Sequence, residues 1–112
     1  PNPQLVLDPW AAASLNDVLR GVIDRGTATS ARLDRPAAGK TGTTSSERDI
    51  WFVGYVPQLS VAVWVGNDDY TPVGKGATGG TFVAPVWRDF MMEVLRGVPV
   101  ENFRPASDFP RP

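Results

Sequence analysis

The middle of the chain carries the clearest pattern of apolar and polar positions. Residues 50–56, IWFVGYV, form a continuous apolar run of strand length that ends before Pro57. Residues 59–66 alternate strictly, which is typical of a strand with two different faces. One face carries Leu59, Val61, Val63 and Val65, and the other carries Ser60, Ala62 and Trp64. Residues 37–44 can also be extended, and the short connections predict a three-stranded antiparallel meander.

Apolar residues recur at helical spacing on both sides of these strands. In the first predicted helix, Asp8 caps the N-terminus, Pro9 takes the first helical position and Gly26 ends the helix. Its predicted apolar face consists of Ala11, Leu15, Val18, Leu19, Val22 and Ile23. After a glycine-rich loop at 67–81, residues 82–97 return to helical spacing. The apolar face predicted there consists of Val83, Val86, Trp87, Phe90, Val94 and Leu95.

The order helix, three strands, helix predicts an α+β fold, in which helices flank an antiparallel β-sheet. A three-stranded sheet has two unpaired edges, so we expect further strands to come from outside this chain. The predicted organisation is one segment over residues 1–97, followed by a proline-rich tail over residues 98–112. We expect that tail to be a linker or terminus that is ordered at most in part.

Composition narrows the classes of function. Eleven basic and twelve acidic residues among 112 give a net charge of −1, which argues against nucleic-acid binding. Histidine and cysteine are absent, which excludes a Ser-His-Asp triad, disulfides and zinc sites with histidine or thiolate ligands within this chain. No apolar run reaches the roughly 20 residues that span a bilayer. The chain starts at PNPQ without a signal peptide, so we expect its true N-terminus to lie elsewhere.

The stretch AAGKTGTT at residues 37–44 carries the candidate chemistry. Its letters GKT match the end of a phosphate-binding P-loop. However, Asp34 stands where the first glycine of that loop belongs, and an acid there would repel phosphate. Pro36 also removes one of the backbone N–H groups that would hold the anion. The residues therefore argue against a phosphate site.

A peptide-binding strand explains the same stretch better. Gly39 and Gly42 let another backbone approach closely, and a peptide can add to the edge of such a strand by main-chain hydrogen bonds. Lys40 adds a positive charge, and Thr41 and Thr43 offer hydroxyl donors to a carboxylate. An ordinary edge strand with a solvated lysine remains the alternative on these eight residues alone.

Longer stretches make this segment more specific. They are AAGKTGTT, DIWFVGYVPQLSVAVWVGND and GGTFVAPVWRDFM, together with RGTA at the end of the first predicted helix. From Trp10 to Leu95 the chain resembles the C-terminal part of the transpeptidase domain of penicillin-binding proteins, and above all of their bifunctional class A type. The resemblance implies the fold that these transpeptidases share with the serine β-lactamases.

The family has three active-site motifs, S-x-x-K, S-x-N and K-T-G, and this chain matches the third. No serine is followed by lysine three residues later; the serines are Ser14, Ser30, Ser45, Ser46, Ser60 and Ser107. The letters S-L-N at residues 14–16 match the second motif, but they fall inside the predicted helix and close to K-T-G, so we interpret the match as accidental. The resemblance thus implies a segment whose nucleophilic serine lies outside this chain, and we expect this chain alone to be inactive.

By resemblance, the whole enzyme is a D,D-transpeptidase that cross-links peptidoglycan stem peptides ending in D-Ala-D-Ala, and β-lactams acylate its serine. Lys40 and Thr43 would act in catalysis, and the Thr43 N–H would be one of two oxyanion donors. Substrate binding would involve Thr41, Gly42, Thr43 and Thr44. No metal and no organic cofactor is implied.

The resemblance also implies partners, a location and roles for the neighbouring residues. The partners would be the rest of the same domain with its S-x-x-K and S-x-N segments, peptidoglycan stem peptides and β-lactam antibiotics, without nucleic acid. The location would be the periplasm or the outer face of the cytoplasmic membrane, with an upstream transmembrane helix as anchor and roles in cell-wall biogenesis, cell shape and antibiotic resistance. Arg48 and Asp49 would be structural, and the loop at 67–81 would shape access for the acceptor peptide.

Two other classes of function stay open. One is a D,D-carboxypeptidase or β-lactamase of the same superfamily, and the other is a non-catalytic peptide-binding module. The stretch DIWFVGY and the valine-rich strand after it favour the transpeptidase.

Overall fold

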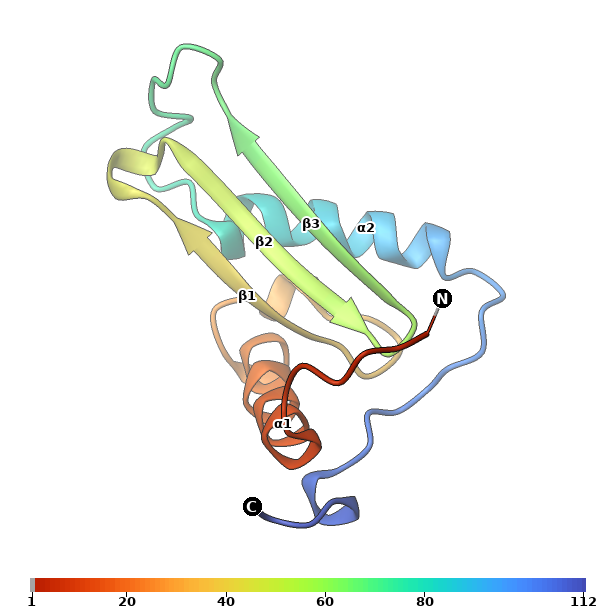
Figure 1. Cartoon of the computed structure of the whole chain (residues 1–112). Helices are drawn as coiled ribbons and strands as arrows, with labels where there is room; N and C mark the ends of the chain where they lie inside the picture. The colour runs from red at the N-terminus through yellow and green to blue at the C-terminus, as the bar shows by residue number, and fades with distance from the viewer. Residues whose placement is uncertain (1) are drawn as a thin grey trace.

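A computed structural model describes residues 2–112 and contains the predicted three-stranded antiparallel sheet, in the order β1-β2-β3. Its strands are β1 (Ala38–Thr43), β2 (Asp49–Val56) and β3 (Leu59–Gly66). Its helices are α1 (Pro9–Arg25) and α2 (Ala84–Val94), and short helical turns lie at Thr29–Ala31, Ser45–Glu47, Gly79–Val83 and Ala106–Asp108. Figure 1 shows α2 lying across one face of the sheet and α1 beside the beginning of β1. The predicted α+β class is confirmed.

The register divides the sheet into a buried and an open face. Phe52 stands opposite Thr41 of β1 and Val63 of β3, so the predicted apolar face of β3 lies on the same side as Phe52. That side is buried beneath α2. Because alternate residues point to opposite faces, Lys40 and Gly42 belong to the other side. There, the apolar side chains of Trp51, Val53 and Trp64 are 42%, 47% and 45% exposed.

Trp87 of α2 is the centre of the buried side. Its ring is fully buried and meets Phe52 edge to face, with the two ring centroids 5.0 Å apart. Its Nε1 donates a hydrogen bond to the carbonyl of Val61 at 3.1 Å. Gly54 of β2 leaves room for the ring, since a Cβ at that position would lie 2.6 Å from Cζ2 of Trp87. The indole therefore links α2 to both β2 and β3.

The helices bury narrower rows than their periodicity predicts. Along α2 and the residues that flank it, the buried row runs through Val83, Trp87, Met91 and Leu95, whereas Val86, Phe90 and Val94 are about half exposed. In α1, Ile23 is buried, but Leu15 and Val18 are largely exposed. The reason is that α1 contacts the sheet along β1 and does not lie flat on a sheet face. The predicted apolar faces were therefore only partly right, and Met91 was missed.

Asp8 caps α1 as predicted, and its contribution can be measured. Its Oδ1 accepts hydrogen bonds from the N–H groups of Trp10 at 2.9 Å and Ala11 at 3.1 Å. Asp8→Ala is expected to lower the free energy of unfolding by about 1 kcal/mol, because these helix-terminal donors lose their acceptor. Urea unfolding of a protein containing the whole domain measures this. Asp8→Asn, which keeps an oxygen acceptor, is the control, and equal stabilities of all three proteins would contradict the capping role.

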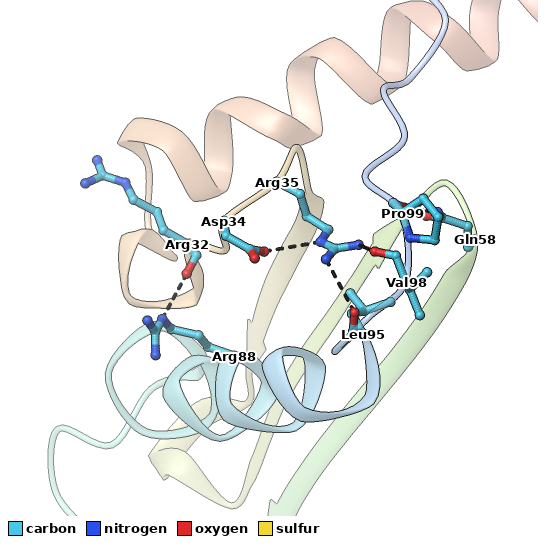
Figure 2. A network of polar contacts seen from close by, with 8 residues as sticks. All are labelled: Arg32, Asp34, Arg35, Gln58, Arg88, Leu95, Val98 and Pro99. Atoms are coloured by element: carbon cyan, nitrogen blue, oxygen red, sulfur yellow. Dashed lines mark hydrogen bonds and ion pairs between the residues drawn. The ribbon is translucent and has the colours of Figure 1, made fainter.

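Arg35 ties the segment before β1 to the end of α2. Its side chain is only 6% exposed and donates hydrogen bonds to the carbonyls of Leu95 at 3.4 Å and Val98 at 3.1 Å. The carboxylate of Asp34 lies 3.2 Å from Nε and balances its charge. Figure 2 shows this network. Arg35 therefore ties the chain just after α2, at Leu95 and Val98, to the segment that leads into β1.

The proline-rich tail, residues 98–112, lies against the rest of the chain. Gln58 Nε2 donates to the carbonyl of Pro99 at 2.8 Å. Further along, the ring of Phe103 packs edge to face on Tyr55, with centroids 5.6 Å apart. Figure 1 shows the tail descending beside the sheet to reach α1. Periodicity does not detect such a contact because it depends on one isolated aromatic side chain.

Candidate active site

The strand β1, which carries K-T-G, has one unpaired edge. β1 pairs only with β2 in this sheet, and at the end of their ladder Thr44 N–H donates to the carbonyl of Asp49 at 3.0 Å. In an antiparallel pair, successive residues direct their N–H and C=O groups alternately toward the partner strand and away from it. The backbone groups of Thr43 and Thr41 therefore point away from β2. The N–H predicted to serve as an oxyanion donor thus faces the open edge.

The Lys40 side chain bends toward the same edge. It is exposed, and its Nζ donates hydrogen bonds to the carbonyl of Thr41 at 3.1 Å and to Thr41 Oγ1 at 3.4 Å. An ammonium group has three donors. One donor remains for a ligand, so the edge combines a positive charge with hydrogen-bond donors.

The two threonine hydroxyls of β1 are held by segments that are distant in sequence. Thr41 Oγ1 lies 3.2 Å from Oγ1 of Thr27, which follows α1. Thr43 Oγ1 accepts the backbone N–H of Gly79, which lies near the end of the glycine-rich loop, at 3.1 Å. The predicted residues Lys40, Thr41 and Thr43 are therefore brought together on one edge, with two neighbours that the sequence did not indicate.

Thr44, Asp49 and Arg48 contribute to the end of the sheet. Thr44 Oγ1 accepts the backbone N–H of Asp49 at 2.9 Å, which closes the connection between β1 and β2. Asp49 Oδ1 accepts the Trp64 indole N–H at 2.9 Å, and the guanidinium of Arg48 lies over the ring of Tyr70 at 5.1 Å. Their side chains are engaged within the fold, as a structural role for Arg48 and Asp49 requires.

The end of the glycine-rich loop packs on β1, where only glycine fits. A Cβ at Gly79 would lie 2.4 Å from the carbonyl oxygen of Trp51, and one at Gly80 would lie 2.0 Å from that of Thr27. Ser30 Oγ donates to the carbonyl of Gly80 at 2.6 Å. Sequence reasoning assigned this loop to substrate access and missed these contacts. The adjacent glycines in TGGT were the available signal, since glycine often marks close backbone approach.

The S-L-N letters lie in α1, as expected, and away from this edge. Asn16 Oδ1 accepts the hydroxyl of Tyr55 at 2.5 Å, across the contact between α1 and β2. Burial raises the pKa of Tyr55, so its hydroxyl stays protonated and keeps donating. Asn16 therefore has a structural role in the described residues.

The fold and the K-T-G edge define a class of protein, and comparison with known families identifies it. Residues 1–92 match the family model described as the penicillin binding protein transpeptidase domain. The chain belongs to this family, which confirms the resemblance seen in its motifs.

Its relatives include penicillin-binding proteins 1A from several bacteria. Penicillin-binding protein 1A of Aquifex aeolicus (strain VF5) is 47% identical over 88 residues, which is 78% of this chain and 12% of that protein. Penicillin-binding protein 1A of Rickettsia bellii (strain RML369-C) is 38% identical over 104 residues, which is 92% of this chain and 13% of that protein. The chain thus spans about one eighth of these curated relatives.

A solved structure agrees in fold. The crystal structure of penicillin-binding protein 1A from Haemophilus influenzae superposes with a TM-score of 0.75 at 25% identity, over 90% of this chain and 17% of that one. Among residues 2–112, no helix combines the length and apolarity that crossing a membrane requires.

Proposed function

We propose that this chain forms the K-T-G wall of the active site of a serine D,D-transpeptidase that cross-links peptidoglycan stem peptides. The observation that carries the proposal is the unpaired edge of β1, where the Thr43 N–H, the Lys40 ammonium and two threonine hydroxyls lie together. An extended peptide binds such an edge by main-chain hydrogen bonds. The charge and the hydroxyls suit a peptide that ends in a carboxylate.

Each group has a distinct role in this proposal. The Lys40 ammonium and the hydroxyls of Thr41 and Thr43 bind the terminal carboxylate of the donor stem. The Thr43 N–H stabilises the oxyanion together with the N–H of a nucleophilic serine outside this chain. That serine attacks the carbonyl between the two D-alanines, and D-alanine leaves as its nitrogen takes up a proton. The amine of a second stem then attacks the acyl-enzyme, forms the new amide and frees the serine.

Gly42 supports this proposal because the described fold does not require glycine there. A Cβ at Gly42 would meet only the Cβ of Trp51, at an ordinary contact distance of 3.5 Å. Glycine in a strand often marks the close approach of another backbone or a ligand. In the proposal, Gly42 keeps the rim of the groove open. Thr44 forms a hydrogen bond at the end of β1, and it is the last of the four residues predicted to bind substrate.

The open face of the sheet is evidence for one proposed partner, which is the rest of the same domain. Trp51, Val53 and Trp64 form a half-exposed apolar group on the face that also carries Lys40. Burial of such side chains is favourable, and the segments with S-x-x-K and S-x-N belong next to Lys40 in this proposal. Since the substrate is peptidoglycan, the enzyme acts outside the cytoplasmic membrane, anchored by an upstream helix, in cell-wall biogenesis.

A fluorescent penicillin tests the proposed function. A full-length protein containing this chain, with a specific protease site inserted before Leu5, is labelled, denatured and cleaved. Because this chain has no S-x-x-K serine, the label is expected on the upstream piece and never on the piece from Leu5 onward. Label on the latter piece, or no label at all, contradicts the proposal. An adduct that hydrolyses within seconds indicates a β-lactamase, and hydrolysis of D-Ala-D-Ala peptides without cross-linking indicates a carboxypeptidase.

A further inference from the structure

The hydroxyl of Thr43 is oriented by the fold. A backbone N–H can only donate, so the bond from Gly79 N–H makes Thr43 Oγ1 an acceptor. The hydroxyl hydrogen of Thr43 is then directed elsewhere, and no protein acceptor for it is found among residues 2–112. Thr43 is exposed at the free edge of β1. Its one remaining donor is therefore available to a ligand there.

The hydroxyl of Thr41 has a similar arrangement. Lys40 Nζ can only donate, so the contact at 3.4 Å makes Thr41 Oγ1 an acceptor. The contact with Thr27 Oγ1 at 3.2 Å can run in either direction. When Thr41 turns its hydrogen toward a carboxylate, Thr27 can reverse its own hydroxyl and donate to Thr41. Thr27 thus keeps Thr41 hydrogen-bonded in both states.

The turn that supplies the Gly79 N–H is held firmly against β1. Ser30 Oγ donates to the carbonyl of Gly80 at 2.6 Å. At the start of the turn, Thr78 and Thr81 cap each other: Thr81 N–H donates to Thr78 Oγ1 at 3.1 Å, and Thr78 N–H donates to Thr81 Oγ1 at 3.2 Å. These reciprocal bonds form a capping box. The direction of the Gly79 N–H is therefore defined before any ligand binds.

We propose that Thr27 and the Gly79–Gly80 turn are positioning elements, which direct the hydroxyl hydrogens of Thr41 and Thr43 toward the carboxylate of the substrate. This inference rests on the proposed function and extends it to residues outside K-T-G. Preset donors suit catalysis because they need little reorganisation when charge arrives. Neither Thr27 nor Gly79 touches the reacting atoms in this scheme.

The experiment compares two ligands that differ only in the carboxylate. The second-order acylation constants of the full-length enzyme are measured with benzylpenicillin and with its methyl ester. Thr27→Val removes the hydroxyl at nearly constant shape and is expected to slow acylation by the acid about tenfold, while the ester reacts at the wild-type rate. Thr27→Ser should restore the acid rate. Ser30→Ala should have a similar selective effect, because it releases the turn.

Thr29→Val is the matched control. The Thr29 side chain is exposed two residues from Thr27, and its hydroxyl has no hydrogen bond within residues 2–112. This variant should match the wild type with both ligands. Equal slowing of acid and ester by Thr27→Val, or no slowing, overturns the positioning role. If Lys40→Ala removes the preference for the acid while Thr27→Val keeps it, only the positioning inference fails. If the wild-type enzyme shows no preference for the acid, both the proposed function and the positioning inference fail.

Discussion

Lys40→Ala in the full-length enzyme is expected to slow acylation by penicillin about ten- to a hundredfold, with the free energy of unfolding almost unchanged. Lys40 is exposed, and its Nζ bonds only to Thr41 within the described residues. Removal of an exposed side chain usually changes stability by no more than about 0.5 kcal/mol. A charge-assisted hydrogen bond to a carboxylate in a partly desolvated groove contributes roughly 1.5–3 kcal/mol, which accounts for the loss of rate.

The chain offers a matched control for this prediction. Lys75 is its other lysine and lies exposed in the glycine-rich loop, so Lys75→Ala should leave the acylation constant unchanged. Lys40→Arg should restore the rate only in part, because a planar guanidinium does not replace a compact ammonium. The measurements are the second-order acylation constant and the melting temperature. A much lower melting temperature with normal acylation by the folded fraction would show that Lys40 supports the fold.

Trp87→Ala is expected to have the largest effect on stability, a loss of about 3–5 kcal/mol. The substitution removes the fully buried ring that contacts Phe52, and it leaves the carbonyl of Val61 without the indole donor. Gly54 has no side chain with which to fill the cavity. Urea unfolding of a protein containing the whole domain measures the change. For a domain of 150–250 residues this corresponds to a fall in melting temperature of roughly 6–20 °C.

Neighbouring substitutions separate this effect from a general sensitivity of α2. Val86 is adjacent in sequence but 51% exposed, so Val86→Ala should change stability by no more than about 0.5 kcal/mol. Trp87→Phe keeps an aromatic ring but loses the hydrogen bond, and it should lie between the wild type and Trp87→Ala. Equal destabilisation by Val86→Ala and Trp87→Ala would contradict the burial described for α2.

The amino-acid sequence determined the features that depend on local chemistry. Alternation at residues 59–66 was enough to assign the two faces of β3, because the pleat of a strand alternates side chains whatever lies around it. Asp8 and Gly26 marked the ends of α1 to the residue, since capping satisfies backbone groups within one helical turn. The motif K-T-G, with the stretches around it, was sufficient to indicate the family that the comparisons confirm.

Tertiary structure alone decided which side chains of the helices are buried and which segments meet at the K-T-G edge. In α2, the rows through Trp87 and through Phe90 are both apolar, so periodicity outlines a wide face, and only the docking of the helix on β2 and β3 selects the row with Met91. At the edge, Thr27 lies 14 residues before its hydrogen-bond partner Thr41, and Gly79 lies 36 residues after its partner Thr43. No local pattern encodes such contacts, because they arise only when loop 26–31 and the glycine turn pack against the same strand.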